Sequence, residues 1–142
     1  MAILVGKEMR LGWSHLLESL ALDSRGAMGF HELFRVYEEC QNAGWDGHGA
    51  APVSEATYEQ AREFLEALPL GAPGPSFGAE ADGHITMEWY GGPRRTLSVS
   101  ITPDGEIHYA ALLGASKSFG SEPFLGESPA IVLDLIRRVT TK

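Results

Sequence analysis

Asp46 and His48 are two residues apart in a glycine-rich stretch, residues 44–52. A carboxylate beside an imidazole is half of the arrangement by which hydrolytic enzymes activate a nucleophile. No serine of the chain, however, lies in a nucleophile-elbow or other signature context, and aspartate next to glycine is a frequent turn former. We therefore expect no catalytic set. The alternative is a small hydrolase-like enzyme in which Asp46 and His48 act with Glu88 or Tyr90.

His84, Glu88 and His108 carry side chains of the kinds that bind metal ions, and the predicted strands place them on one face. In the predicted register the two histidines lie on strands separated by a third strand, so their backbones are on the order of 10 Å apart. Ligands of one zinc ion need nitrogen atoms about 2.0 to 2.1 Å from the metal. We therefore expect these residues to form no metal site, and we expect no cofactor.

Cys40 is the only cysteine, so the chain cannot form an internal disulfide. It falls on the apolar stripe of a predicted helix, where a lone thiol acts as a small hydrophobic residue rather than as a nucleophile. This cysteine usage fits a reducing compartment. The N-terminus lacks the apolar core of a signal peptide, and no run of about 18 apolar residues predicts a membrane span. We expect a cytoplasmic protein without a membrane partner.

The chain has 11 basic and 19 acidic residues, which gives a formal net charge of −8. Phosphate backbones repel such a charge, and the adjacent arginines at 94–95 and 137–138 are too few to form a basic patch. A nucleic-acid partner is therefore not expected. Because acidic surfaces attract basic ones, the charge favours another protein as the partner.

Apolar residues three and four apart predict three helices in the N-terminal half, about residues 7–69. The first helix has Ser14 as its cap. Residues 23–29 are predicted to connect it to the second helix, at residues 30–40.

The loop that follows is predicted to be structural. Gly44 suits the left-handed residue that ends a helix, and Trp45 is placed to cover the last turn. Pro52 and Ser54 then begin the third helix, which Pro69 ends.

Alternating apolar and polar residues predict strands in HITMEWY, TLSVSIT and EIHYAALL, at residues 84–90, 96–102 and 106–113. A short strand containing Phe77 precedes them. The turns and the shared apolar face predict the register, with Ala79 opposite Ile85, Trp89 opposite Leu97, Thr86 opposite Ser100, Ile101 opposite Ile107 and Ser100 opposite His108. These segments form a four-stranded antiparallel meander at about residues 76–113.

Residues 114–127 are rich in glycine and serine and are predicted to be a mobile loop. Its apolar side chains are the candidate contacts to a partner protein: Phe119, Phe124 and Leu125. Ser128 is the predicted cap of a C-terminal helix at about residues 128–140, with Pro129 at its first position. The expected fold is α+β, a single domain of residues 1–142 in which three N-terminal helices and one C-terminal helix cover the apolar face of the meander.

One group of motifs runs through the middle half of the chain: Trp45, Asp46, Gly47, Gly49 and Ala50 in a W-D-G-x-G-A loop, Pro52, Leu68 and Pro69 around an amphipathic helix, Asp82 and Gly83 in a turn, and Glu88 and Trp89 in a strand. This order resembles small uncharacterised bacterial proteins, in which tyrosine commonly stands at the position of His48 and asparagine often at that of Gly44. The resemblance implies no known activity, cofactor or ligand, and associates the chain loosely with accessory or mobile-element proteins. We expect the loop residues and Trp89 to be structural.

Small size, net charge and the lack of a catalytic set favour a non-enzymatic binding protein of antitoxin, immunity or phage-inhibitor type. Such a protein acts by docking on a partner. The oligomeric state stays open, because the edge strands of the meander can also pair with a second copy.

Overall fold

The computed structural model describes residues 24–141, so the predicted helix around Ser14 lies outside the described residues. Two helices precede an antiparallel sheet and a third follows it. The elements are α2 (Ser24–Glu39), α3 (Glu55–Glu66), β1 (Ser76–Ala79), β2 (Ile85–Gly92), β3 (Arg95–Ile101), β4 (Glu106–Leu113), β5 (Ser116–Pro123) and α4 (Ala130–Thr140). The predicted α+β class and antiparallel sheet are confirmed, whereas the sheet has five strands in place of the predicted four.

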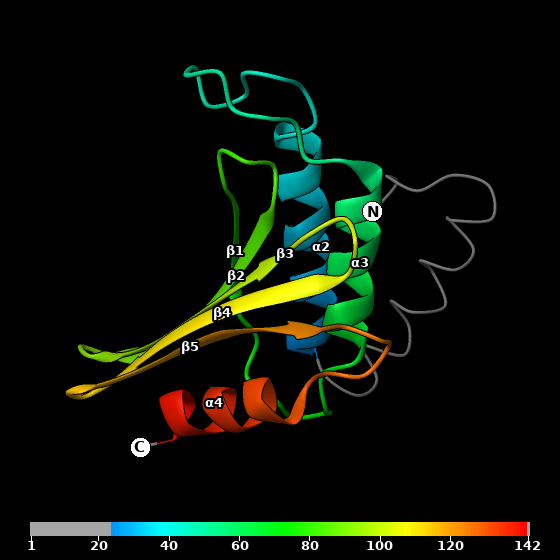
Figure 1. Ribbon diagram of the computed structural model, residues 1–142. Helices are drawn as coiled ribbons and strands as arrows, with labels where there is room; N and C mark the ends of the chain where they lie inside the picture. Colours follow the sequence, from blue (N-terminus) through cyan, green and yellow to red (C-terminus); the bar gives the residue numbers. More distant parts are fainter. Residues whose placement is uncertain (1–23, 142) are drawn as a thin grey trace.

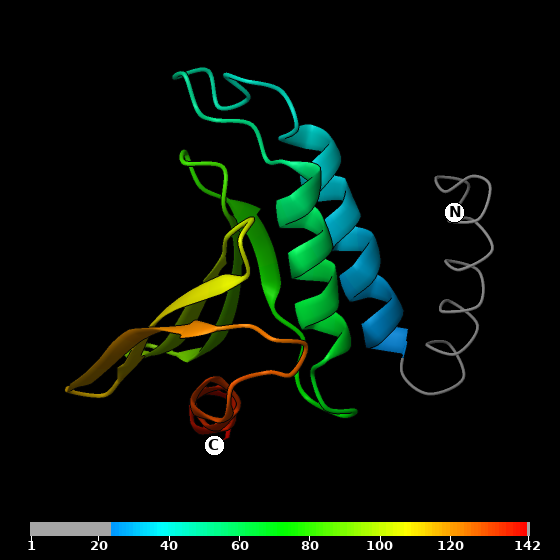
Figure 2. The same cartoon turned by 45° about the vertical axis from the view of Figure 1, so that its right-hand side comes forward.

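The three helices pack on one face of the twisted sheet. Helices α2 and α3 lie side by side and run in opposite directions against one end of it, and α4 crosses its other end (Figures 1 and 2). Helices and strands share one hydrophobic core, whose largest fully buried side chains are Trp89, Phe64, Leu33, Ile85, Met87, Leu97, Ile101, Ile107 and Leu135. Within residues 24–141 no helix has the length and apolar character needed to cross a membrane.

The predicted register of the first four strands is confirmed. Observed pairs include Ala79 with Ile85, Trp89 with Leu97, Thr86 with Ser100, Ile101 with Ile107 and Ser100 with His108. The alternation of buried and exposed side chains leaves only one register that buries every apolar residue, because a slip by one residue exposes them all.

The segment predicted to be a mobile loop instead contains strand β5, which pairs along its whole length with β4. Its inward positions are Ser118, Gly120 and Glu122, so the sequence lacks the apolar alternation that marks a half-buried strand. Gly120 lies beneath the ring of Tyr109: a Cβ atom at this glycine would be 2.7 Å from the tyrosine oxygen. The strand is therefore held by backbone pairing, with Tyr109 supplying the apolar cover.

Two predicted helix boundaries are wrong. Helix α2 begins at Ser24, although residues 23–29 were predicted to be a connection. A Cβ atom at Gly29 would be 3.6 Å from Leu65 and 3.9 Å from Phe77, so close packing on α3 and β1 keeps this glycine-containing segment helical. Ser128 does not cap α4, because the N-cap residue is Pro129 and the buried Ser128 hydroxyl has no partner within the described residues.

The C-terminal end of α4 is fixed to the sheet by Arg95. Its guanidinium donates to the carbonyl oxygens of Val139, at 2.7 Å, and Thr141. A cation at this end of a helix satisfies carbonyl groups that have no partner inside the helix. Gly91 lies at the same contact, where a Cβ atom would be 1.8 Å from the oxygen of Val139.

We predict that Gly91→Ala separates α4 from β2 and lowers the free energy of unfolding by about 1 to 3 kcal/mol, the usual cost of overpacking. Gly78→Ala in β1 is the matched control, because a Cβ atom there would have no neighbour within 4 Å. Urea denaturation followed by tryptophan fluorescence measures both. Equal stability of the two variants would show that α4 does not need this close approach.

Candidate functional site

The W-D-G-x-G-A loop is organised by hydrogen bonds of its own. Asp46 Oδ1 accepts the backbone N–H groups of His48 and Ala50 at 2.8 and 3.0 Å. Gly44 has the predicted left-handed conformation, with a φ of 75°, but it does not end a helix, because α2 already ends at Glu39. Its N–H donates to the oxygen of Ala50 at 2.7 Å and so closes the loop itself. The half-buried Trp45 donates through Nε1 to the oxygen of Ala51 at 2.7 Å. Asp46 and Trp45 therefore stabilise the conformation of the loop.

The same loop is attached to the helices and to the sheet. The N–H of Val53 donates to the oxygen of Cys40, and the N–H of Ala51 donates to the oxygen of Ala81 in the β1–β2 turn, each at 2.8 Å. Burial raises the pKa of the Cys40 thiol, which keeps it protonated and unreactive. The predicted cap of α3 is present, because the N–H of Thr57 donates to Ser54 Oγ at 3.1 Å.

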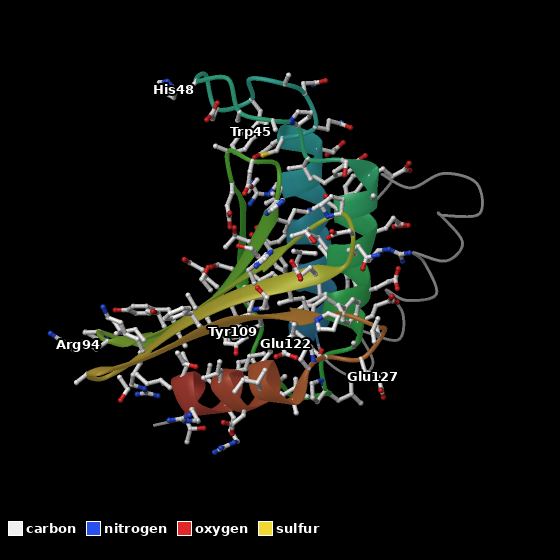
Figure 3. The ribbon with its side chains drawn as sticks, in the orientation of Figure 1. Trp45, His48, Arg94, Tyr109, Glu122 and Glu127 are labelled. Carbon is white, nitrogen blue, oxygen red and sulfur yellow. The ribbon has the colours of Figure 1, made fainter. Side chains whose placement is uncertain are left out.

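The alternative hydrolase set is not assembled. His48 is exposed at the outer end of the loop (Figure 3), and its backbone rather than its ring meets the Asp46 carboxylate. Glu88 and Tyr90 lie three and five residues beyond Ile85, where β2 begins, so about 10 Å or more of strand separates them from the loop contact at Ala81.

The face of the sheet opposite the helices is the main exposed surface of the described strands. We call it the outer face, and it consists of Thr86, Glu88 and Tyr90 on β2, Thr96, Ser98 and Ser100 on β3, His108, Ala110 and Leu112 on β4, and Lys117, Phe119 and Ser121 on β5. All three described helices pack on the other side (Figure 2). No element of residues 24–141 therefore covers the outer face.

Large apolar side chains stand exposed on the outer face. Tyr90 is 71% exposed and Phe119 is 79% exposed. Phe119 is opposite Ala110 on β4, and Leu112 lies two residues further along that strand, in the same row as Tyr90. Together these side chains form a partly apolar stripe across the sheet.

The three predicted contact residues have different environments. Phe124 is only 7% exposed and packs edge-on against Phe64 in the core, with ring centroids 5.7 Å apart. Its side chain is therefore part of the folded core and not of a surface. Leu125 is 85% exposed in the segment after β5. Phe119 and Leu125 thus remain available to a partner.

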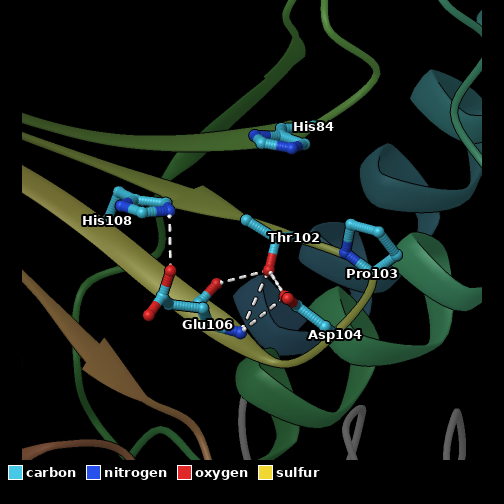
Figure 4. Close-up of a pocket in the computed structure, with 6 residues that line it drawn as sticks. All are labelled: His84, Thr102, Pro103, Asp104, Glu106 and His108. Atoms are coloured by element: carbon cyan, nitrogen blue, oxygen red, sulfur yellow. Dashed lines mark hydrogen bonds and ion pairs between the residues drawn. The ribbon is translucent and has the colours of Figure 1, made fainter.

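An open pocket of about 440 Å³ lies at the other end of the outer face (Figure 4). Its lining comes from the start of β2 and from the β3–β4 hairpin: His84, Thr102, Pro103, Asp104, Glu106 and His108. The sequence identified the two histidines as candidate site residues but not the hairpin residues. The pattern of the hairpin residues predicts only a turn and does not show that this turn lies beside the histidines.

The polar groups of the pocket bind one another. The Thr102 hydroxyl donates to Asp104 Oδ1, and this bond together with the N–H of Glu106 lowers the pKa of the Asp104 carboxyl. His108 Nε2 is 3.3 Å from Glu106 Oε1, while its Nδ1 is 2.8 Å from Ser121 Oγ. Both ring nitrogens of His108 are therefore occupied.

The set weighed as metal ligands from sequence is only partly brought together. His84 and His108 line the same pocket, but Glu88 does not. Among residues 24–141 the side chains that converge as a possible metal set are Glu80, Asp82 and His84, whose ligand atoms lie within 4.8 Å of one another. The sequence around Glu80 and Asp82 predicts an ordinary hairpin turn and gives no indication of a metal site.

Comparisons with protein-family models, with curated proteins and with solved structures give no significant match. The resemblance of the W-D-G-x-G-A loop to small bacterial proteins therefore stays a prediction, and the geometry carries the functional argument.

We predict that Trp45→Ala lowers the free energy of unfolding by about 2 to 3 kcal/mol. The half-buried ring accounts for part of the cost of a buried Trp→Ala change, and the lost hydrogen bond to Ala51 adds about 1 kcal/mol. Trp45→Phe is the control, because it keeps most of the packing and loses the N–H donor. Urea denaturation of both variants measures this, and wild-type stability of Trp45→Ala would contradict a structural role.

Proposed function

We propose that this protein is a non-enzymatic acidic binding module that docks through the outer face of its sheet on a basic surface of another protein. Its mode of action is that of an antitoxin, an immunity protein or a phage or mobile-element inhibitor, which blocks a partner by covering it. The observation that carries the proposal is the exposure of Tyr90 and Phe119 on a sheet face that no described element covers.

Aromatic side chains in such positions suit a docking surface. Large exposed apolar groups are unfavourable in water, and burial of each against a partner releases free energy in proportion to the area covered. Tyrosine is enriched among the residues that dominate binding energy, since its ring is large and its hydroxyl can still form a hydrogen bond. Tyr90 is paired with Thr96 on β3 and Phe119 with Ala110 on β4. A backbone held in a sheet reduces the entropy lost on binding.

The charge distribution favours a basic partner. The chain carries a formal net charge of −8. Carboxylates gather at the pocket end of the outer face, where Asp104 and Glu106 line the pocket and Asp82 lies beside His84. Among residues 24–141, no lysine or arginine lines that pocket. A positively charged surface would therefore be drawn to this end, while the aromatic residues supply the apolar contact.

No observation favours the hydrolase alternative. The Asp46 carboxylate is engaged by two backbone N–H groups, and the pocket is lined by residues other than Asp46 and His48.

We predict that Tyr90→Ala and Phe119→Ala each weaken binding to the partner at least about tenfold, as expected when a hot-spot side chain is truncated. Leu70→Ala is the matched control, because Leu70 is 80% exposed but lies after α3, outside the outer face. The immobilised variants are compared in capture from a bacterial lysate at low ionic strength, with quantitative mass spectrometry of the retained proteins.

The supporting result is a protein retained by the wild type and by Leu70→Ala and lost from both outer-face variants, with retention falling between about 0.05 M and 0.5 M salt because charge attraction is screened. Retention that is equal in all variants, or that no added salt weakens, would overturn the proposal. Circular dichroism checks that the variants are folded.

A further inference from the structure

The turn between β1 and β2 brings three metal-ligating side chains together. Glu80 and His84 pair across the turn, since the N–H of Glu80 donates to the oxygen of His84 at 2.9 Å, and Asp82 stands between them in the chain. The possible ligand atoms of the three residues lie within 4.8 Å of one another. The three residues therefore belong to one short hairpin turn.

Asp82 and His84 already have the spacing of two ligands on one ion. Asp82 Oδ1 accepts the N–H of His84 at 3.0 Å, which fixes the orientation of the carboxylate. Its other oxygen, Oδ2, is 3.2 Å from His84 Nδ1. Two atoms bound tetrahedrally to one zinc ion at about 2.0 to 2.1 Å are about 3.4 Å apart. The separation of these two atoms therefore fits two ligands of one ion with little movement.

Glu80 is oriented by two hydroxyl groups of the outer face. Thr86 Oγ1 and Ser100 Oγ both donate to Glu80 Oε2, the first at 2.6 Å. Both bonds reach the same oxygen, Oε2, and neither uses Oε1. Hydrogen bonds of this kind to a ligating carboxylate are the usual second layer of a metal site, where they hold the ligand in place.

The surroundings attract a cation. His84 also lines the outer-face pocket, whose other charged groups are the carboxylates of Asp104 and Glu106. Because no lysine or arginine of the described chain lines this pocket, its carboxylates favour a cation. An imidazole with two carboxylates suits a borderline ion such as Zn²⁺ better than Mg²⁺ or Ca²⁺, which prefer oxygen ligands alone.

We propose that Glu80, Asp82 and His84 bind one divalent transition-metal ion, with water at the remaining coordination positions. The site shares no residue with the aromatic stripe at Tyr90 and Phe119, so the test of metal binding is independent of the test of docking. Three protein ligands leave the ion open to solvent on the outer face, as in sites that keep an exchangeable position.

Titration calorimetry with zinc chloride on the purified full chain tests this proposal. We expect one ion per chain, and His84→Gln and Glu80→Gln should each lower the affinity at least about tenfold, because each removes a ligand. His108→Gln is the matched control: His108 lines the same pocket but is not part of the converging set, so its loss should change the affinity less than about twofold. Magnesium chloride should bind far more weakly than zinc.

Histidine side-chain NMR gives an independent readout. Added zinc should shift the ring nitrogens of His84 and leave those of the other four histidines in place. Unchanged zinc affinity in His84→Gln, or an equal loss of affinity in His108→Gln, would overturn the site. Shifts at all five histidines would also overturn it, because they would reveal diffuse attraction of zinc to the acidic surface.

Discussion

The whole arrangement depends on burying one face of the antiparallel sheet. Strand side chains alternate between two faces, so placing Ile85, Met87 and Trp89 in the core forces their neighbours out on the other side. Three helices cover the apolar face, and the described chain has no fourth helix for the opposite one. The outer face, with its aromatic residues, pocket and carboxylates, is therefore a direct consequence of how the core is built.

Two glycine-containing turns that are far apart in the sequence contact each other in space. The W-D-G-x-G-A loop donates through Ala51 to the oxygen of Ala81, in the turn that holds Asp82. Gly83 leaves room for this approach, since a Cβ atom there would be 2.6 Å from the oxygen of Pro52. The loop that was predicted to be structural thus also supports the neighbouring β1–β2 turn.

Sequence patterns predicted most of the fold because the governing physics is local. The alternation in residues 84–113 specified the register of three strands and the turns between them, and Ser54 marked the start of α3. Strand β5 was not predicted, because its own sequence lacks alternating apolar residues. The apolar contact at Gly120 comes from Tyr109, which lies on another strand. The start of α2 was missed for a related reason, as packing against Leu65 and Phe77 outweighs the poor helix propensity of glycine.

The candidate site was less predictable than the fold, because it depends on which turns lie next to each other in space. The sequence pattern predicted His84 and His108 on separate strands. The pocket that both residues line could not be predicted from this pattern, because it depends on the twist of the sheet. The hydroxyl groups of Thr86 and Ser100 orient the carboxylate of Glu80, and Ser100 is 20 residues away from it in the sequence. This arrangement is visible only in the folded chain.

The order of the strands, β1-β2-β3-β4-β5, is also their order along the chain. Every strand pairing therefore closes a short loop, which costs little chain entropy and favours rapid folding. The packing of α4 on β2 and β3 closes a much longer stretch of chain, and Arg95 secures it through the oxygens of Val139 and Thr141. We expect the meander to be able to form early along the folding pathway, with α4 docking on it afterwards to complete the core.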